Sequence, residues 1–236
     1  MVNGNRIIEI DALRGGAIIA MMIYHFIFDL NFLGIVPINI YELPILLFQR
    51  SIGTLFLLLV GVSLTLSESG NNEGYRKHAK RGLLLAAIAL IITIATWIYP
   101  NRAFISFGII HLIALSTFIA PFFFKFGKWN YLIGILIVLF GLYCANIYAS
   151  SDYLFWLGLK SASYEALDYY PVLPWFGIVL IGIPMGKLIL EIKRKSSVPT
   201  NIVVKLLMWL GRRSLQIYLV HQPIIIGILI AYLIIK

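Results

Sequence analysis

Seven long apolar segments, separated by short polar ones, make up most of the 236-residue chain. They lie near residues 12–34, 44–66, 82–99, 104–124, 130–148, 172–190 and 212–235. Each is close to the ~20 apolar residues that a helix needs to cross a bilayer. Lipid offers no hydrogen-bond partner to an open backbone, so such segments cross it as helices. The pattern predicts an all-α protein, a polytopic membrane bundle of about seven transmembrane helices that forms one domain over residues 1–236.

The composition agrees with a membrane protein. Hydrophobic residues make up 61% of the chain and charged residues only 12%, about half the share found in typical soluble domains. The first apolar segment is too long for a signal peptide and has no small-residue cleavage site, so we expect it to be retained. The single cysteine, Cys144, excludes an intrachain disulfide and a cysteine-based metal cluster.

The formal net charge of +9 is explained by topology rather than by nucleic-acid binding. With a cytoplasmic N-terminus, 15 of the 19 Lys and Arg residues fall in cytoplasmic segments. The other four are Arg50, Arg102, Lys160 and Lys236. Because cytoplasmic loops carry an excess of basic residues, the sequence predicts a multi-pass protein of the cell membrane with its N-terminus inside and its C-terminus outside.

A polar segment at residues 191–213 precedes the last apolar one and includes a Lys-Arg-Lys run at 193–195. Thr200 or Asn201 is placed to cap a short helix that starts at Ile202. We expect this helix to lie at the membrane interface before Gly211 turns the chain into the last span.

The first apolar segment contains ionisable groups that lipid disfavours. At about 100° per residue, Arg14 and His25 fall on nearly the same helix face, roughly 16 Å apart along the axis. Asp29 follows one turn later. Such groups usually face a protein interior and mark a functional path. We interpret His25 as a general base whose ring is oriented by the Asp29 carboxylate. For Arg14, binding of a phosphate and snorkelling to headgroups remain equally open.

Other polar residues in or near the apolar segments each have more than one possible role. His111 and His221 either pair helices or belong to the site, and Gln222 is part of a polar surface around His221. Arg50 has three open roles: binding an acidic or sugar acceptor, pairing with Glu42 or Asp29, or contacting a lipid phosphate. The histidine spacings match no zinc motif, so we expect no metal.

Four segments together resemble the small prokaryotic members of the heparan-alpha-glucosaminide N-acetyltransferase family. They begin Glu9-Ile-Asp-Ala-Leu-Arg-Gly-Gly, Phe107-Gly-Ile-Ile-His, Asp168-Tyr-Tyr-Pro-Val-Leu-Pro-Trp and Gly211-Arg-Arg-Ser-Leu-Gln-Ile-Tyr-Leu-Val-His-Gln-Pro. These proteins belong to a wider transmembrane acyltransferase superfamily. Its polysaccharide O-acetyltransferases carry a basic residue, ten further residues and a histidine in the first span, as Arg14 and His25 do. In the lysosomal enzyme the catalytic histidine lies after the first span, where residues 30–43 of this chain have none.

The resemblance implies an enzyme that moves an acyl group, typically acetyl, from cytoplasmic acyl-CoA to a hydroxyl or amine on a sugar or envelope glycan at the outer face. Arg14 would meet the CoA phosphates and His25 the thioester. The remaining candidates are Tyr24, His111, His221 and Gln222 for the acyl-CoA co-substrate, and Arg50 and Asp168 for the acceptor. Membrane lipids are the other expected partners, and a homo-oligomer is compatible with the sequence. The rival interpretation is a proton-coupled transporter that uses His25 and Asp29 as a proton relay, and a non-catalytic membrane scaffold is a third.

Overall fold

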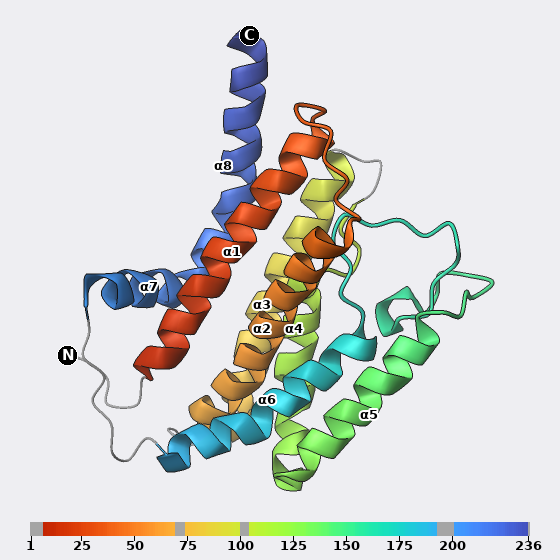
Figure 1. Cartoon of the computed structure of the whole chain (residues 1–236). Coiled ribbons are helices and arrows are strands. Elements are labelled where there is room, and N and C mark those ends of the chain that lie inside the picture. Colours follow the sequence, from red (N-terminus) through yellow and green to blue (C-terminus); the bar gives the residue numbers. More distant parts are fainter. Residues whose placement is uncertain (1–6, 69–73, 100–103, 193–200, 236) are drawn as a thin grey trace. The chain divides into compact units, whose positions relative to one another are not determined.

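The computed structural model (Figure 1) describes residues 7–68, 74–99, 104–192 and 201–235. Within these ranges the chain forms helices and no strands, with one isolated bridge between Phe107 and Tyr169. The α-helices are α1 (Ile8–Phe32), α2 (Leu43–Glu68), α3 (Gly74–Ile98), α4 (Ile109–Ile119), α5 (Trp129–Cys144), α6 (Val172–Ile192), α7 (Ile202–Arg212) and α8 (Ser214–Ile235). A 3-10 helix, η1 (Ala120–Phe126), continues α4, and a second, η2, covers Phe155–Leu157. The predicted all-α membrane bundle is confirmed.

Six of these helices are long and apolar enough to cross a bilayer, counting α4 with η1 as one. The segment expected at 130–148 is the exception, because α5 has only 16 residues, which span about 24 Å at 1.5 Å per residue. The helix ends at Cys144, and the side chain of Asn146 then donates to the Leu142 carbonyl at 3.1 Å. Asn favours such local bonds over continuing a helix, which explains why the apolar pattern overestimates this helix.

The structure groups the chain into two compact units, which are described separately. The first contains residues 1–56 and 196–236, and therefore α1, the first half of α2, α7 and α8. The second contains residues 57–195, with the rest of α2 and α3 to α6. One domain over the whole chain stays a prediction.

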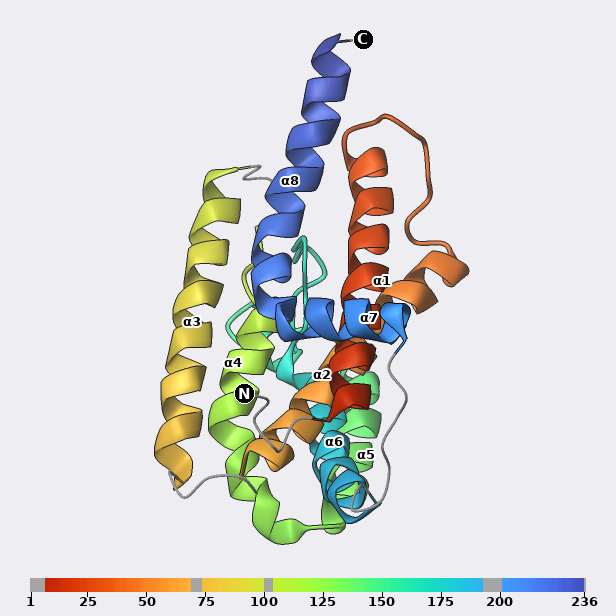
Figure 2. The same ribbon diagram turned by 90° about the vertical axis from the view of Figure 1, so that its left-hand side faces the viewer.

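In the first unit α7 lies across α1 (Figures 1 and 2), and two glycines let the helix backbones touch. A Cβ added at Gly15 of α1 would overlap the carbonyl oxygen of Leu207 on α7. A Cβ added at Gly211 would overlap the carbonyl oxygen of Asp11 on α1. The tandem Gly15-Gly16 of the sequence thus serves helix packing at its first position, while a Cβ at Gly16 would meet nothing within 4 Å.

This contact predicts opposite outcomes for two neighbouring substitutions. Gly15→Ala should lower the free energy of unfolding by roughly 1–3 kcal/mol, because α7 must move away from the new methyl group. Gly16→Ala has free space and should be neutral, or stabilising by up to about 1 kcal/mol through better helix propensity. Thermal unfolding of both variants in the same detergent checks this. Equal melting temperatures would show that α7 does not pack on Gly15.

The short helix predicted after Asn201 is confirmed as α7. The Asn201 side chain accepts a hydrogen bond from the Val204 N–H at 2.9 Å and so caps the helix. Ile202 and Leu206 expose 80% and 56% of their surface, which fits a helix lying at the membrane interface; that location stays a prediction. The Lys-Arg-Lys run at 193–195 lies outside the described residues, as do Arg6, Arg102 and Lys236.

In the second unit α5 and α6 run side by side (Figure 1) and meet at facing glycines. A Cβ at Gly134 of α5 would lie 2.6 Å from the carbonyl oxygen of Gly177 on α6. On α2, Gly61 lies close to Gly182 of α6, and the Thr65 hydroxyl donates to the Ile183 carbonyl at 3.1 Å. Close packing of small residues and hydroxyl bonds of this kind hold helices together in a bilayer, where the hydrophobic effect between them is lost.

Candidate active site

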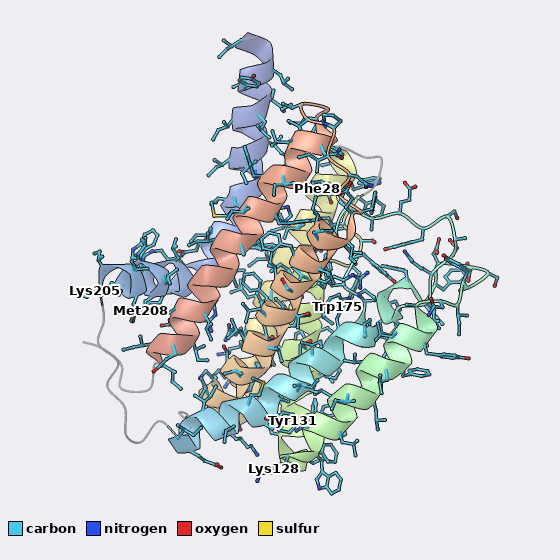
Figure 3. The ribbon with its side chains drawn as sticks, viewed as in Figure 1. Phe28, Lys128, Tyr131, Trp175, Lys205 and Met208 are labelled. Atoms are coloured by element: carbon cyan, nitrogen blue, oxygen red, sulfur yellow. The ribbon has the colours of Figure 1, made fainter. Side chains whose placement is uncertain are left out.

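The first unit brings together two of the histidines that the sequence singles out. His25 of α1 and His221 of α8 have ring centroids 4.8 Å apart, with the planes inclined at 65°. The ring of Tyr24 lies 5.6 Å from that of His25, and the ring of Tyr218 lies 5.6 Å from that of His221. Phe28, the next α1 ring after Tyr24 on this face, is labelled in Figure 3. The imidazole pair therefore lies between aromatic side chains of α1 and α8.

Asp29 does not orient His25 in the way the sequence suggests. Its side chain is fully buried, and Oδ1 accepts a hydrogen bond from Nε2 of Gln222 on α8 at 2.8 Å. Asp29 Oδ2 and His25 Nδ1 are both buried and have no hydrogen-bond partner among the described residues. The carboxylate is held by an amide 193 positions further along the chain, a contact that spacing within α1 could not reveal.

The ring of His221 has an orientation defined by a hydrogen bond to the backbone. Its Nδ1 lies 2.7 Å from the carbonyl oxygen of Tyr218. Because a carbonyl can only accept, Nδ1 carries the hydrogen, and in the neutral ring Nε2 keeps the lone pair. This Nε2 is buried and has no partner among the described residues. An imidazole with one nitrogen fixed by the backbone and the other free is the usual arrangement of a ring that acts on a ligand.

Arg14 belongs to a charged cluster where α1 meets α7, which we call the arginine cluster: Asp11, Arg14 and Arg212. Arg14 Nη1 lies 3.2 Å from Asp11 Oδ1, and Arg212 Nε lies 3.2 Å from Asp11 Oδ2. Asp11 is buried, while the Arg14 and Arg212 side chains expose 23% and 38% of their surface. Two guanidinium groups share one carboxylate, so the three side chains carry a net charge of +1. Guanidinium groups bind phosphate through paired hydrogen bonds.

Sequence reasoning missed the roles of Asp11 and Arg212. Asp11 lies three residues before Arg14, a spacing at which helical side chains meet, and this signal was readable. Arg212 lies 201 positions from Asp11, and only the packing of α7 on α1 brings it there. Lys205 and Met208, labelled in Figure 3, mark α7 in the view with side chains.

His111 lies in the second unit, where both ring nitrogens are engaged. Nδ1 accepts from the Gly108 N–H at 3.2 Å, so Nε2 carries the hydrogen and donates to the Thr93 hydroxyl at 3.0 Å. That hydroxyl in turn donates to the Ile105 carbonyl at 2.7 Å. His111 thus closes the first turn of α4 and ties it to α3.

Asp168, which the sequence predicts to bind the acyl acceptor, also caps the start of α4. Its Oδ2 accepts from the Ile109 N–H at 3.0 Å, and this oxygen occupies the space that a side chain at Gly108 would need. Burial raises the pKa of Asp168 to about 6, partly offset by that hydrogen bond. The carboxylate replaces the capping side chain that Gly108 lacks.

The raised pKa of Asp168 predicts a pH dependence of stability. The folded state holds the proton of Asp168 up to about pH 6, whereas an unfolded chain releases it near pH 3.9. The free energy of unfolding should therefore decrease as the pH rises from about 4 to about 6. Asp168→Asn removes this titration, so the melting temperature of the variant should vary less between pH 5 and pH 7 than that of the wild type. Identical pH profiles would contradict the assignment.

Arg50 is exposed on α2 and, among the described residues, pairs with neither Asp29 nor Glu42. No group of three His, Cys, Asp or Glu side chains within the described ranges is close enough to hold a metal. The structure thus brings His25, Asp29, His221, Gln222 and Tyr24 together, and places Arg14 in the same unit. His111 and Asp168 belong to the other unit.

Comparison with protein families decides the classification. The model of the family described as heparan-alpha-glucosaminide N-acetyltransferase, catalytic, matches residues 6–223. The chain belongs to this family. The match runs from the start of α1 to Pro223 in α8, and so includes every site residue predicted from the sequence. No curated protein and no solved structure matches the chain.

Membership of this acetyltransferase family confirms the resemblance noted in the sequence. It makes the protein a membrane protein of the acetyltransferase type, with six long apolar helices in its described part.

Proposed function

We propose that the protein is an acyl-CoA-dependent transmembrane acyltransferase. It moves an acyl group, typically acetyl, from cytoplasmic acyl-CoA to a hydroxyl or amine of a sugar or envelope glycan at the outer face of the cell membrane. The observation that supports this most is the arrangement on α1. Arg14 of the arginine cluster and His25 of the imidazole pair lie on one helix, about 16 Å apart along its axis, a separation that suits a donor that enters from one surface and reacts deep in the membrane.

In the proposed reaction Arg14 and Arg212 bind the phosphate groups of acyl-CoA, and the pantetheine arm extends along α1 toward His25. His25 Nδ1 accepts the proton of the acceptor hydroxyl or amine. At the same time the oxygen or nitrogen of the acceptor forms a bond to the acyl carbon. The carbon–sulfur bond breaks, and the proton taken by His25 returns to the sulfur, so CoA leaves as the thiol. A positioned base of this kind contributes about 10²- to 10⁴-fold in rate. Tyr24, His221 and Gln222 are the polar neighbours that contact the thioester or the acceptor.

The experiment uses purified protein in liposomes, with acetyl-labelled acetyl-CoA on one side and methyl glucosaminide on the other. Label should appear in the glycoside only when protein is present, and faster when acetyl-CoA faces the arginine cluster. Empty liposomes and liposomes with Arg14→Ala serve as controls. Absence of acetyl-CoA binding, together with solute uptake driven by a pH gradient, would overturn the proposal and favour a proton-coupled transporter.

A further inference from the structure

Four buried polar atoms of α1 and α8 have no hydrogen-bond partner among the described residues. They are His25 Nδ1, Asp29 Oδ2, His221 Nε2 and Gln222 Oε1, and we call them the α1–α8 cluster. The contact between the two imidazole rings and the hydrogen bond from Gln222 to Asp29 place them within about one helical turn of each other. Asp29 and His221 are 0% and 5% exposed.

Such atoms are costly to leave unpaired. A buried polar atom without a partner costs about 1–3 kcal/mol, and folded proteins leave few of them. Asp11, the other buried polar side chain among the described residues of the first unit, is paired with two guanidinium groups. Four unpaired atoms on two facing helices therefore indicate a place prepared for a polar ligand.

The hydrogen-bonding capacity of the cluster limits the ligand. His221 Nε2 carries a lone pair, because Nδ1–H faces the Tyr218 carbonyl. Gln222 Oε1 is a carbonyl oxygen, since the Nε2 of the same amide donates to Asp29. Asp29 Oδ2 belongs to a carboxylate. These three atoms only accept hydrogen bonds, and His25 Nδ1 accepts when it acts as a base.

A thioester group cannot pair with the atoms of the α1–α8 cluster, because its carbonyl oxygen and sulfur have no hydrogen to donate. The acyl acceptor brings O–H or N–H groups. We propose that His221, Gln222 and Asp29 hold the acyl acceptor through its own hydroxyl or amine hydrogens, beside His25, and that none of the three contacts the thioester group. This inference rests on the proposed function and assigns the two α8 side chains to the acceptor rather than to the donor.

The cluster therefore selects acceptors by the number of hydrogen-bond donors that they carry. A nucleophile that donates one hydrogen to His25 must offer further O–H or N–H groups to satisfy the remaining atoms. An analogue that lacks them leaves buried acceptors unpaired, which sites of this type reject strongly. His221 and Gln222 are then residues that position the acceptor and set its specificity, while His25 takes the proton.

The test measures binding without turnover, with protein in lipid nanodiscs. The probes are methyl glucosaminide, the same glycoside with its hydroxyl groups methylated, and acetyl-CoA. Saturation-transfer NMR should show binding of the first glycoside and not of the methylated one.

His221→Phe and Gln222→Met keep the side-chain size and remove the accepting atoms. Each should weaken glycoside binding at least about 10-fold and leave the acetyl-CoA affinity, measured by calorimetry, within about twofold. Gln216→Met, on the exposed side of α8, is the matched control.

The wild-type protein provides a readout that does not depend on a variant folding. With ¹⁵N-labelled histidine, the Nε2 signal of His221 should be that of an unprotonated nitrogen and should shift on addition of glycoside but not of acetyl-CoA. A shift with acetyl-CoA alone, equal binding of both glycosides, or no glycoside binding at all would overturn the inference. Failure of the proposed function gives a different result: acetyl-CoA does not bind, while the glycoside still shifts the Nε2 signal of His221.

Discussion

His25→Ala should reduce acyl transfer by about 10²- to 10⁴-fold, the usual contribution of a general base, while the protein still inserts and folds. The structure explains why folding survives. His25 Nδ1 has no hydrogen-bond partner among the described residues, so its removal breaks no hydrogen bond of this atom. Single-turnover transfer in liposomes measures the rate, and thermal unfolding measures the stability.

His111→Ala is the matched comparison, with the opposite expectation. It removes the bonds to Gly108 and Thr93 and should lower the melting temperature clearly. Full transfer by a well-folded His25→Ala protein would eliminate His25 as the base. Asp29→Asn keeps the oxygen that Gln222 contacts and should leave a residual rate. If Asp29 and His25 act as one unit, the double variant should be scarcely slower than His25→Ala.

Arg14→Ala should weaken the binding of free CoA by about 10- to 150-fold, because hydrogen bonds to charged groups contribute roughly 1.5–3 kcal/mol. Arg14→Lys should recover little of this, since a lysine lacks the paired donors of the guanidinium group. Isothermal titration calorimetry in detergent measures both. Arg50→Ala removes an exposed arginine of α2 and should leave the affinity unchanged. Unaltered CoA binding by Arg14→Ala would show that Arg14 does not bind the phosphates of the donor.

Much of the fold could be predicted from hydropathy, because a bilayer forces each apolar segment of sufficient length into a helix. The cap at Asn201 was also readable, since its chemistry is local. The early end of α5 could not be predicted, because an apolar pattern does not reveal where a helix ends. The two glycine contacts of α7 with α1 depend on tertiary packing, which a hydropathy pattern does not reveal.

The site divides in the same way. Arg14 and His25 could be placed on one face because both belong to one helix with a fixed period. The partners of Asp29 and of the arginine cluster lie 193 and 201 positions away, and periodicity carries no information about such contacts. Spacing within α1 therefore favours the nearest histidine as the partner of Asp29, whereas the structure pairs Asp29 with Gln222. His111 is a candidate for the site from its position in an apolar segment, yet one of its nitrogens bonds to Gly108 at the start of α4 and the other to Thr93 of α3.

In the proposed reaction, the single carboxylate shared by Arg14 and Arg212 makes donor binding sensitive to ionic strength. The three side chains carry a net charge of +1 and both guanidinium groups are partly exposed, so dissolved ions compete with the phosphates of CoA. The screening length falls from about 10 Å at 0.1 M salt to about 3 Å at 1 M. His25, about 16 Å further along α1, lies beyond that range. Added salt should therefore raise the concentration of acyl-CoA needed for half-maximal rate and leave the rate at saturation nearly constant.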